Sequence, residues 1–322
     1  MRNLWIKTFR RCFGNWIFEF EICLKFDVCN LKFRNTASLQ RYSIHGGSPI
    51  MLKLVVCIKQ VPMVSELPWN PKTGTLKREL AEGMMNPSCA HALEAALQIK
   101  SRQKSEITAI TMGPPMAEEV LYEAMAVGAD RGLLLTDPAF AAADTYATSY
   151  TLARTIEMQC PVFDLVLCGC YTSDSETAQV GPQLAEELDI PAAAYVEDIE
   201  VENRTVRMQR VSDNFLEIME MELPGLVTIM TRSYEPRYPT LEGLADAFDR
   251  PEIKTLSADT IGVDLNKIGR NGSPTRIINV YSPTAEKKNV VLKGPAKKVV
   301  NAIFDNYGEK ISGAMGKDLK KL

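Results

Sequence analysis

The chain of 322 residues is long enough for about two domains, and its 46% apolar and 24% charged residues are ordinary for a globular protein. Residues 1–50 carry eight Lys and Arg against three Asp and Glu, whereas the whole chain has a net charge of −3, so the body is acidic. An acidic body argues against nucleic acid as a partner, and no apolar run reaches the ~18 residues that a membrane span needs.

The cysteines are scattered, at positions 12, 23, 29, 57, 89, 160, 168 and 170. They form neither a disulfide framework nor a pair of Cys-x-x-Cys clips. The lone Cys-x-Cys of Cys168 and Cys170 offers too few ligands for zinc or an iron–sulfur centre. We therefore expect no metal site, and reduced thiols in a cytoplasmic protein. With His45 and His91 as the two histidines, histidine-based catalysis has little room.

Residues 1–50 look foreign to the rest of the chain. They hold six of the eleven Phe and two of the three Trp, and they follow neither a period of 2 nor one of 3.6. Glu19, Glu21 and Asp27 interrupt the apolar region, which argues against a signal peptide and, with the aromatics, against a mitochondrial presequence. We expect a non-native or misannotated extension with Met51 as the true start, which the mass of the native protein tests.

From residue 51 onward, apolar runs alternate with amphipathic stretches. A turn at 70–74 predicts a small hairpin. Strands are expected at 52–58, 107–112, 133–136, 163–167 and 192–196, and helices from Asn86-Pro87 onward and at 116–127, 143–158 and 179–188. This alternation predicts an α/β fold with a doubly wound, mostly parallel sheet of the Rossmann-like kind, covered by helices on both faces.

Beyond residue 196 the pattern changes. The segments 199–211, 215–222 and 226–231 have no helices between them, which predicts an antiparallel extension of the sheet. Residues 250–294 show little periodicity. A last amphipathic helix is expected near 295–307, with one apolar face formed by Val299, Val300, Ile303, Phe304 and Tyr307.

The chain therefore divides into three expected parts: the extension 1–50, a nucleotide-binding α/β domain at 51–249 and a C-terminal arm at 250–322. A poorly periodic tail that ends in an apolar helix is typical of a segment that docks on a partner subunit. The alternative is that the arm folds back on its own domain.

The stretch 168–182 is the most informative for function. It follows an expected buried strand and precedes an expected helix, and its Ser, Thr and Asp residues lie in between. A small and polar turn from a strand to a helix N-terminus is the geometry that holds a phosphate or a ribose. Neither a P-loop nor a G-x-G-x-x-G pattern is present. An ordinary βα turn with a capped helix is the alternative.

Six motifs in order resemble the beta subunit of electron-transfer flavoproteins, from residue 51 to about 283. They are V-V-C-I-K-Q-V-P at 55–62, N-P at 86–87, M-G-P-P at 112–115, A-V-G-A-D-R at 126–131, T-A-Q-V-G-P at 177–182 and Y-E-P-R-Y-P at 234–239. The resemblance implies a fold of the adenine-nucleotide alpha-hydrolase-like superfamily. It also implies a heterodimer whose alpha subunit carries the FAD that cycles electrons.

By the same resemblance, this chain binds an adenine nucleotide of its own. The residues expected to contact it are Cys57, Asn86, Pro87, Ser88, Cys89, Met112, Gly169, Asp174, Thr177, Ala178, Gln179 and Val180. Helix N-termini at this sheet edge would favour a phosphate, with Asp174 accepting from ribose hydroxyls and Thr177 donating to a phosphate. The alternative role of Asn86 and Thr177 as helix caps is compatible with ligand binding.

In many members of the family this nucleotide is AMP, with a structural role. In electron-bifurcating members it is a second FAD, which accepts a hydride from NADH. The stretch at 177–182 resembles the bifurcating type more than the Asn-Gln-Thr-Gly pattern of AMP-binding members, which favours FAD. Residues 170–173, Cys-Tyr-Thr-Ser, depart from the basic residue, Gln, Ala and Ile that the family usually has there.

The segment 237–244 resembles the family's docking loop for acyl-CoA dehydrogenases. Tyr238 and Leu241 are the expected docking residues, with Leu241 entering an apolar pocket of the partner. The alternative is that Leu241 starts a helix over 241–248 and packs inward. Another dehydrogenase, NADH and ferredoxin are further candidate partners, because the sequence does not name the electron donor or acceptor.

No residue of this chain is expected to act as a catalytic acid, base or nucleophile. The resemblance therefore implies an electron carrier subunit rather than a self-contained enzyme, with NADH oxidation as an added activity if the nucleotide is FAD. The alternatives are an AMP-binding regulatory module and a nucleotide-dependent enzyme of related fold, such as an ATP pyrophosphatase. The latter needs a phosphate loop after the first strand, where this chain has K-Q-V-P at 59–62.

Overall fold

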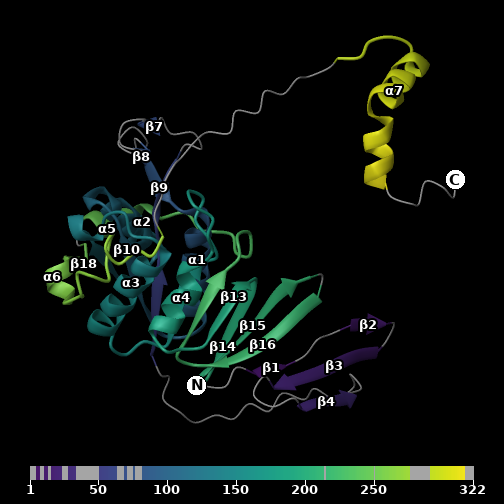
Figure 1. Ribbon diagram of the computed structural model, residues 1–322. Helices are drawn as coiled ribbons and strands as arrows, with labels where there is room; N and C mark the ends of the chain where they lie inside the picture. The colour runs from purple at the N-terminus through teal and green to yellow at the C-terminus, as the bar shows by residue number, and fades with distance from the viewer. Residues whose placement is uncertain are drawn as a thin grey trace. The chain divides into compact units, whose positions relative to one another are not determined.

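The computed structural model describes residues 51–63, 82–213, 215–249, 251–275 and 291–315, and the backbone of short strands within 5–33 and 69–76 (Figure 1). The chain divides into two units, Met1–Ile277 and Ile278–Leu322. The second unit contains α7 (Ala296–Met315), which begins where the sequence predicts a helix and runs further. In α7 the side chains of Val300, Phe304 and Tyr307 are exposed.

A parallel sheet of seven strands forms the centre of the first unit, in the order β13-β17-β12-β5-β10-β11-β18. The strands are β5 (Leu52–Cys57), β10 (Ser105–Met112), β11 (Arg131–Leu135), β12 (Leu165–Gly169), β13 (Ala192–Val196), β17 (Gly225–Ile229) and β18 (Ile253–Leu256). Their apolar residues are largely buried because both faces of the sheet are covered. The predicted doubly wound α/β fold is confirmed.

Helices lie on both faces of this sheet. On one face are α1 (Pro87–Arg102) and α2 (Glu119–Val127), and on the other α3 (Thr145–Gln159), α4 (Val180–Glu187) and α6 (Ala258–Ile261). Successive residues of a strand point to opposite faces, so Val56 belongs to the core layer under α1 and Val55 to the layer under α3. The core therefore consists of two apolar layers separated by the sheet.

The sheet has its topological switch point between β5 and β12. From β5 the chain proceeds to β10 and β11 on one side, and then returns past β5 to β12 on the other side. Ligands of open α/β sheets bind outside the carboxyl ends of the strands at such a point. The fold thus directs attention to the residues that follow β5 and β12.

A second, antiparallel sheet contains β14 (Asp198–Glu202), β15 (Thr205–Ser212) and β16 (Phe215–Glu222) (Figure 1). Beyond β16 it continues with β1 (Trp5–Lys7), β3 (Trp16–Cys23) and β2 (Arg11–Phe13) in that order, and β4 (Val28–Phe33) also pairs with β3. The buried side chains of Ile199, Met208 and Met219 join the core layer under α1. The segments 199–211 and 215–222 are therefore antiparallel, as predicted.

The prediction that 226–231 extends the antiparallel strands is wrong. β17 pairs in parallel with β12 and β13 inside the main sheet. All five of its residues are buried, which is typical of a parallel strand with both faces covered. A continuous apolar run reads the same in either kind of sheet, so the sequence pattern did not separate the two.

Two smaller features also bear on the sequence predictions. The hairpin at 70–74 is confirmed by the pairing of β7 (Trp69–Asn70) with β8 (Thr75–Leu76), and β6 (Gln60–Pro62) pairs with β9 (Gly83–Met85).

Residues 253–256, from the stretch with little periodicity, form β18 and pair with β11 at the sheet edge. A strand of four residues is too short to show a period, and the sheet therefore continues past residue 249.

The end of α2 and the start of α3 follow their local signals. Asp144 caps α3 by accepting from the Ala147 N–H at 3.0 Å. Gly128, with φ 125°, ends α2 as predicted, although a 3₁₀ turn, η2 (Pro115–Glu118), precedes that helix. The strand predicted at 163–167 is displaced by two residues, to Leu165–Gly169.

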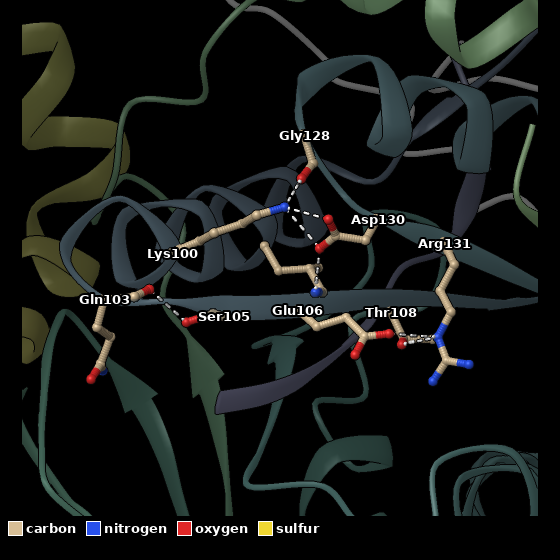
Figure 2. Close-up of polar contacts among 9 residues, drawn as sticks. Lys100, Gln103, Ser105, Glu106, Thr108, Gly128, Asp130 and Arg131 are labelled. Atoms are coloured by element: carbon tan, nitrogen blue, oxygen red, sulfur yellow. Dashed lines mark hydrogen bonds and ion pairs between the residues drawn. The ribbon is translucent and has the colours of Figure 1, made fainter. Parts of the chain in front are cut away.

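The motif A-V-G-A-D-R at 126–131 ties the amino ends of β10 and β11 to α1 (Figure 2). The Asp130 carboxylate accepts from Lys100 Nζ and from the Ile107 N–H, each at 2.7 Å. Lys100 also donates to the Gly128 carbonyl at 3.0 Å, and Arg131 Nε donates to Thr108 Oγ1 at 2.8 Å. These contacts lie at the edge opposite the carboxyl ends of the strands, so they stabilise the fold rather than form a ligand site.

Tyr234 joins the segment after β17 to the antiparallel sheet. Its hydroxyl accepts from the Ile199 N–H at 2.9 Å and donates to Asp198 Oδ1 at 3.2 Å. Burial raises the pKa of Tyr234, and the nearby Asp198 carboxylate raises it further. The hydrogen bond from the Ile199 N–H lowers this pKa but does not cancel the rise. Because folding favours the neutral phenol, the resulting stability is present below the unfolded pKa of about 10 and is lost as the pH rises above it.

We expect Tyr234→Phe to lower the free energy of unfolding at neutral pH by about 1–2 kcal/mol, because the Ile199 N–H loses its acceptor. The variant should also lose less stability than the parent protein between neutral pH and about pH 10.5. Denaturant unfolding of both proteins at the two pH values measures this. Equal stability of the two proteins at neutral pH would contradict the expectation.

Candidate functional site

The candidate site lies where β5 and β12 end beside the start of α1. Cys57 ends β5, Gly169 ends β12, and Cys57 pairs in register with Cys168. A Cβ atom on Gly169 would lie 2.7 Å from the Ser88 carbonyl carbon and 2.8 Å from the Cys89 nitrogen. Only glycine allows this approach, so the helix N-terminus reaches the end of the strand.

Asn86 is at the N-cap position of α1, as predicted, but its side chain does not cap the helix. The side chain is buried, and it donates from Nδ2 to the Tyr171 carbonyl at 2.9 Å and accepts at Oδ1 from the Ser173 N–H at 3.0 Å. The alternative role of Asn86 as a side-chain cap therefore does not hold, because the loop after β12 uses both ends of the amide. Among the described residues, no side chain caps α1, and its first turn contains no acidic residue.

The alternative role of Thr177, as the cap of the helix after the loop, does not hold. α4 begins at Val180 with Gln179 at the N-cap position, and Thr177 is exposed on the preceding loop. Glu176 and Ala178 have φ values of 50° and 55°, a left-handed conformation that costs a non-glycine residue about 1–2 kcal/mol. This backbone delays the start of the helix. The sequence has neither Gly nor Asn there to signal it.

Asp174 forms an ion pair across the switch point. Both of its carboxylate oxygens accept from Lys59 Nζ at 2.8 Å, and its side chain is 6% exposed. Lys59 follows β5, so the pair joins the loops that leave β5 and β12. Sequence reasoning did not include Lys59 in the site. Lys59 could have been found from its position in the V-V-C-I-K-Q-V-P motif, where it follows the expected contact residue Cys57 by two residues.

Four buried cysteines gather around this edge: Cys57, Cys89, Cys168 and Cys170. Burial raises the pKa of Cys89, and a hydrogen bond with the Cys57 thiol, together with burial, raises the pKa of Cys168. These two are therefore neutral thiols that pack like apolar side chains. In the described part of the chain, no group of three or more His, Cys, Asp and Glu is arranged to hold a metal ion.

The remaining predicted contacts surround this group. Met112 ends β10, the strand beside β5, and packs with Val180 against the core layer under α3, whereas Cys89 belongs to the layer under α1. Gln179 Oε1 accepts from Thr145 Oγ1 at 2.9 Å, which links the starts of α4 and α3. The structure thus brings Cys57, Asn86, Ser88, Cys89, Gly169 and Asp174 together. Pro87 and Thr177 are exposed.

The two expected docking residues project from the surface. Tyr238 is 92% exposed and Leu241 is 87% exposed. The helix given as the alternative does form, as α5 (Leu241–Asp249), but Leu241 does not pack inward. α5 lies on α2, where the rings of Tyr122 and Phe248 stack at 4.9 Å.

The family model of the electron transfer flavoprotein domain matches residues 73–261. This chain belongs to the electron transfer flavoprotein family. It is 40% identical over 259 residues to the electron transfer flavoprotein subunit beta of Thermoanaerobacterium thermosaccharolyticum, which covers 80% of this chain and 99% of that protein. The chain therefore corresponds to a beta subunit of the electron transfer flavoproteins.

Two further relatives carry other names. The caffeyl-CoA reductase-Etf complex subunit CarD of Acetobacterium woodii is 40% identical over 261 residues, which cover 80% of this chain and 99% of that protein. Protein FixA of Bradyrhizobium diazoefficiens is 38% identical over 265 residues, which cover 78% of this chain and 91% of that protein. Within the described residues, the electron transfer flavoprotein chain has no helix that is long and apolar enough to cross a bilayer.

Proposed function

We propose that this chain is the beta subunit of a heterodimeric electron carrier and that its site at the switch point binds an adenine nucleotide. The alpha subunit carries the FAD that accepts and passes on electrons. The observation that carries the proposal is the meeting of β5, β12 and the start of α1, which Gly169 permits and Asn86 holds. This edge is where open α/β sheets bind nucleotides.

The residues at this edge fit such a ligand. In the described structure the N-termini of α1 and α4 have no side-chain cap, and their first turns contain no acidic residue, so both favour a phosphate group. Lys59, whose carbonyl accepts from the Asn86 N–H at the start of α1, adds an ammonium group that is paired with Asp174. The exposed Thr177 supplies a hydroxyl donor. The Ser88 hydroxyl bonds to Thr231 and the Asp174 carboxylate to Lys59, so a ligand contact of either side chain would share or replace these bonds.

We propose FAD rather than AMP as this nucleotide, because T-A-Q-V-G-P at 177–182 resembles the electron-bifurcating members. A bound flavin would accept a hydride from NADH. In this proposal the described residues at the edge bind and orient the ligand, and none of them is given the role of an acid, a base or a nucleophile. An AMP at the same edge would make the role of these residues purely structural.

An acyl-CoA dehydrogenase or another dehydrogenase is the proposed electron donor that docks at Tyr238 and Leu241. Two exposed apolar residues of this size suit a small anchor in a partner's pocket. The relatives named for caffeyl-CoA reductase and for the acryloyl-CoA reductase electron transfer subunit of Anaerotignum propionicum support a partner that handles CoA esters. NADH and ferredoxin are further proposed partners, whose use depends on the alpha subunit.

The part of the expected arm that lies in the second unit, 278–322, is proposed to reach the alpha subunit through α7, whereas β18 and α6 pack in the first unit. Exposed apolar side chains on this helix, Val300, Phe304 and Tyr307, support that role. The exposed docking residues also favour an electron carrier over a regulatory AMP-binding module that acts alone.

Nucleotide content tests the proposal directly. The full chain is co-expressed with the neighbouring alpha subunit, and the purified complex is denatured so that FAD and AMP can be quantified by chromatography. We expect two FAD per heterodimer and no AMP. If the complex contains one FAD and one AMP, the nucleotide site is kept but its ligand is AMP and not FAD. If it contains a single FAD and no AMP, the proposed site in this chain is contradicted.

A further inference from the structure

One side of α1 carries three polar residues at a spacing of three: Ser88, His91 and Glu94. Residues three apart are neighbours on a helix surface. Each of the three bonds to a successive point of the segment 231–237, which we call the linking segment. The linking segment begins at the carboxyl end of β17, beside the nucleotide edge, and ends one residue before Tyr238.

The first two bonds fix the start of the linking segment. Ser88 Oγ lies 2.7 Å from Thr231 Oγ1, and His91 Nε2 accepts from the Arg232 N–H at 3.3 Å. Arg232 has a φ of 78°, a left-handed conformation that persists only where its surroundings hold it. The start of the linking segment is therefore held against the first two turns of α1.

Glu94 makes the strongest contacts of the three. It accepts from Arg237 Nε at 2.8 Å, from Nη2 at 2.9 Å and from the Arg237 N–H at 3.2 Å. The Glu94 side chain is 6% exposed and that of Arg237 is 43% exposed. Two parallel guanidinium bonds fix direction as well as distance, so Glu94 orients the backbone immediately before Tyr238.

A second anchor lies on the far side of the docking residues. Thr240 Oγ1 accepts from the Gly243 N–H at 3.0 Å, at the start of α5. A Cβ atom on Gly243 would lie 2.3 Å from the Ala126 carbonyl oxygen, so α5 begins in close contact with the end of α2. Tyr238 and Leu241 are thus exposed on a short stretch held between Arg237 and Gly243.

We propose that Glu94 is a positioning residue for partner docking. Its hydrogen bonds with Arg237 hold Tyr238 and Leu241 in the geometry that a dehydrogenase recognises. The inference rests on the proposed function of those two residues. Holding them before the encounter removes the ordering cost that a loose segment pays on binding. Loss of the bonds between Glu94 and Arg237 should therefore weaken docking without changing the nucleotide site or the electron transfer step.

The test uses the heterodimer of the full chain with its alpha subunit. A purified acyl-CoA dehydrogenase with its acyl-CoA substrate reduces the heterodimer, and KM for the heterodimer and kcat are measured. We expect Glu94→Gln to raise KM roughly tenfold with kcat and flavin content unchanged. Leu241→Ala should raise KM at least as much. In a protein that already carries Leu241→Ala, adding Glu94→Gln should raise KM by less than about threefold. Glu94 acts by positioning the docking residues, so its effect is smaller once the Leu241 side chain has been removed.

Asp164→Asn is the matched control. Asp164 is a carboxylate with a 9% exposed side chain that accepts from Arg204 Nη1 at 3.0 Å and from the Lys53 N–H at 2.8 Å. It lies just before β12, at the opposite edge of the sheet. We expect this variant to lower the melting temperature about as much as Glu94→Gln and to leave KM unchanged. An equal rise of KM in both variants would make the effect one of general stability and overturn the positioning role.

Other outcomes separate the inference from the proposed function. A KM that stays within twofold in Glu94→Gln but rises in Leu241→Ala overturns the positioning role and keeps the docking surface. An unchanged KM in Leu241→Ala overturns both. Amide hydrogen exchange at 235–241 should be faster in Glu94→Gln, and an unchanged rate contradicts the inference. If Glu94→Gln does not fold, Arg237→Gln takes its place: it removes the two guanidinium bonds to Glu94 and keeps the bond from the backbone N–H.

Discussion

Gly169→Ala is expected to remove the nucleotide that we propose at this edge and to lower the free energy of unfolding by about 1–3 kcal/mol. The new Cβ atom would meet the Ser88 carbonyl carbon at 2.7 Å and the Cys89 nitrogen at 2.8 Å. Both are backbone atoms of α1, so they cannot rotate away as a side chain can. The start of α1 must shift instead, and the Ser88 and Cys89 groups shift with it.

Nucleotide quantified after denaturation of the complex measures the first effect, and denaturant unfolding measures the second. Gly308→Ala is the control, because a Cβ atom there meets no atom of the described structure within 4 Å. Gly308 lies inside α7, where alanine favours a helix by about 1 kcal/mol. Full nucleotide content in Gly169→Ala would show that the close approach of β12 and α1 does not shape the site.

Asn86→Ala should give the second large effect, a loss of about 2–4 kcal/mol in the free energy of unfolding together with a fall in nucleotide content. The Asn86 side chain is 1% exposed and bonds to the Tyr171 carbonyl and the Ser173 N–H. Alanine leaves both backbone groups without these partners and opens a small cavity. The loop after β12 then loses its attachment to α1.

Asn86→Asp separates the two bonds. A carboxylate still accepts from the Ser173 N–H, but it places a buried negative charge against the Tyr171 carbonyl oxygen, so the loss of stability should be at least as large as that of Asn86→Ala. Asn306→Ala is the control, since Asn306 donates to the Ala302 carbonyl on the exposed surface of α7, where a change within about 0.5 kcal/mol is expected. An Asn86→Ala protein with full stability and nucleotide would show that the loop needs no such attachment.

The sequence predicted the parts of the fold that are specified locally. The strands β5, β10 and β12 are apolar runs because they are buried on both faces, and the ends of α2 and α3 carry the glycine and the aspartate that such ends favour. What it did not separate was the direction of β17, since buried parallel and antiparallel strands share the same composition. β18 escaped notice because a strand of four residues shows no period.

The sequence predicted which edge of the sheet carries the candidate site and which positions lie near it. It did not predict which side chains contact one another there. Asn86 meets its loop partners across 85 and 87 residues of sequence, Lys59 meets Asp174 across 115, and Glu94 meets Arg237 across 143. Such pairs depend on how strands are ordered in the sheet, which local patterns do not encode. The same limit explains why capping was the natural interpretation of Asn86, whose residue type suits both roles.

The burial of the thiols makes this chain a convenient background for site-specific labelling. Residues 51–322 contain five cysteines, and all five are buried, so maleimide reagents that need an exposed thiolate should modify them slowly. A single cysteine introduced by Phe248→Cys, at a position that is 64% exposed on α5, would then be the fast-reacting thiol of a chain that starts at Met51. A fluorophore attached there would report the arrival of a partner at α5 by its change in emission, without any electron transfer.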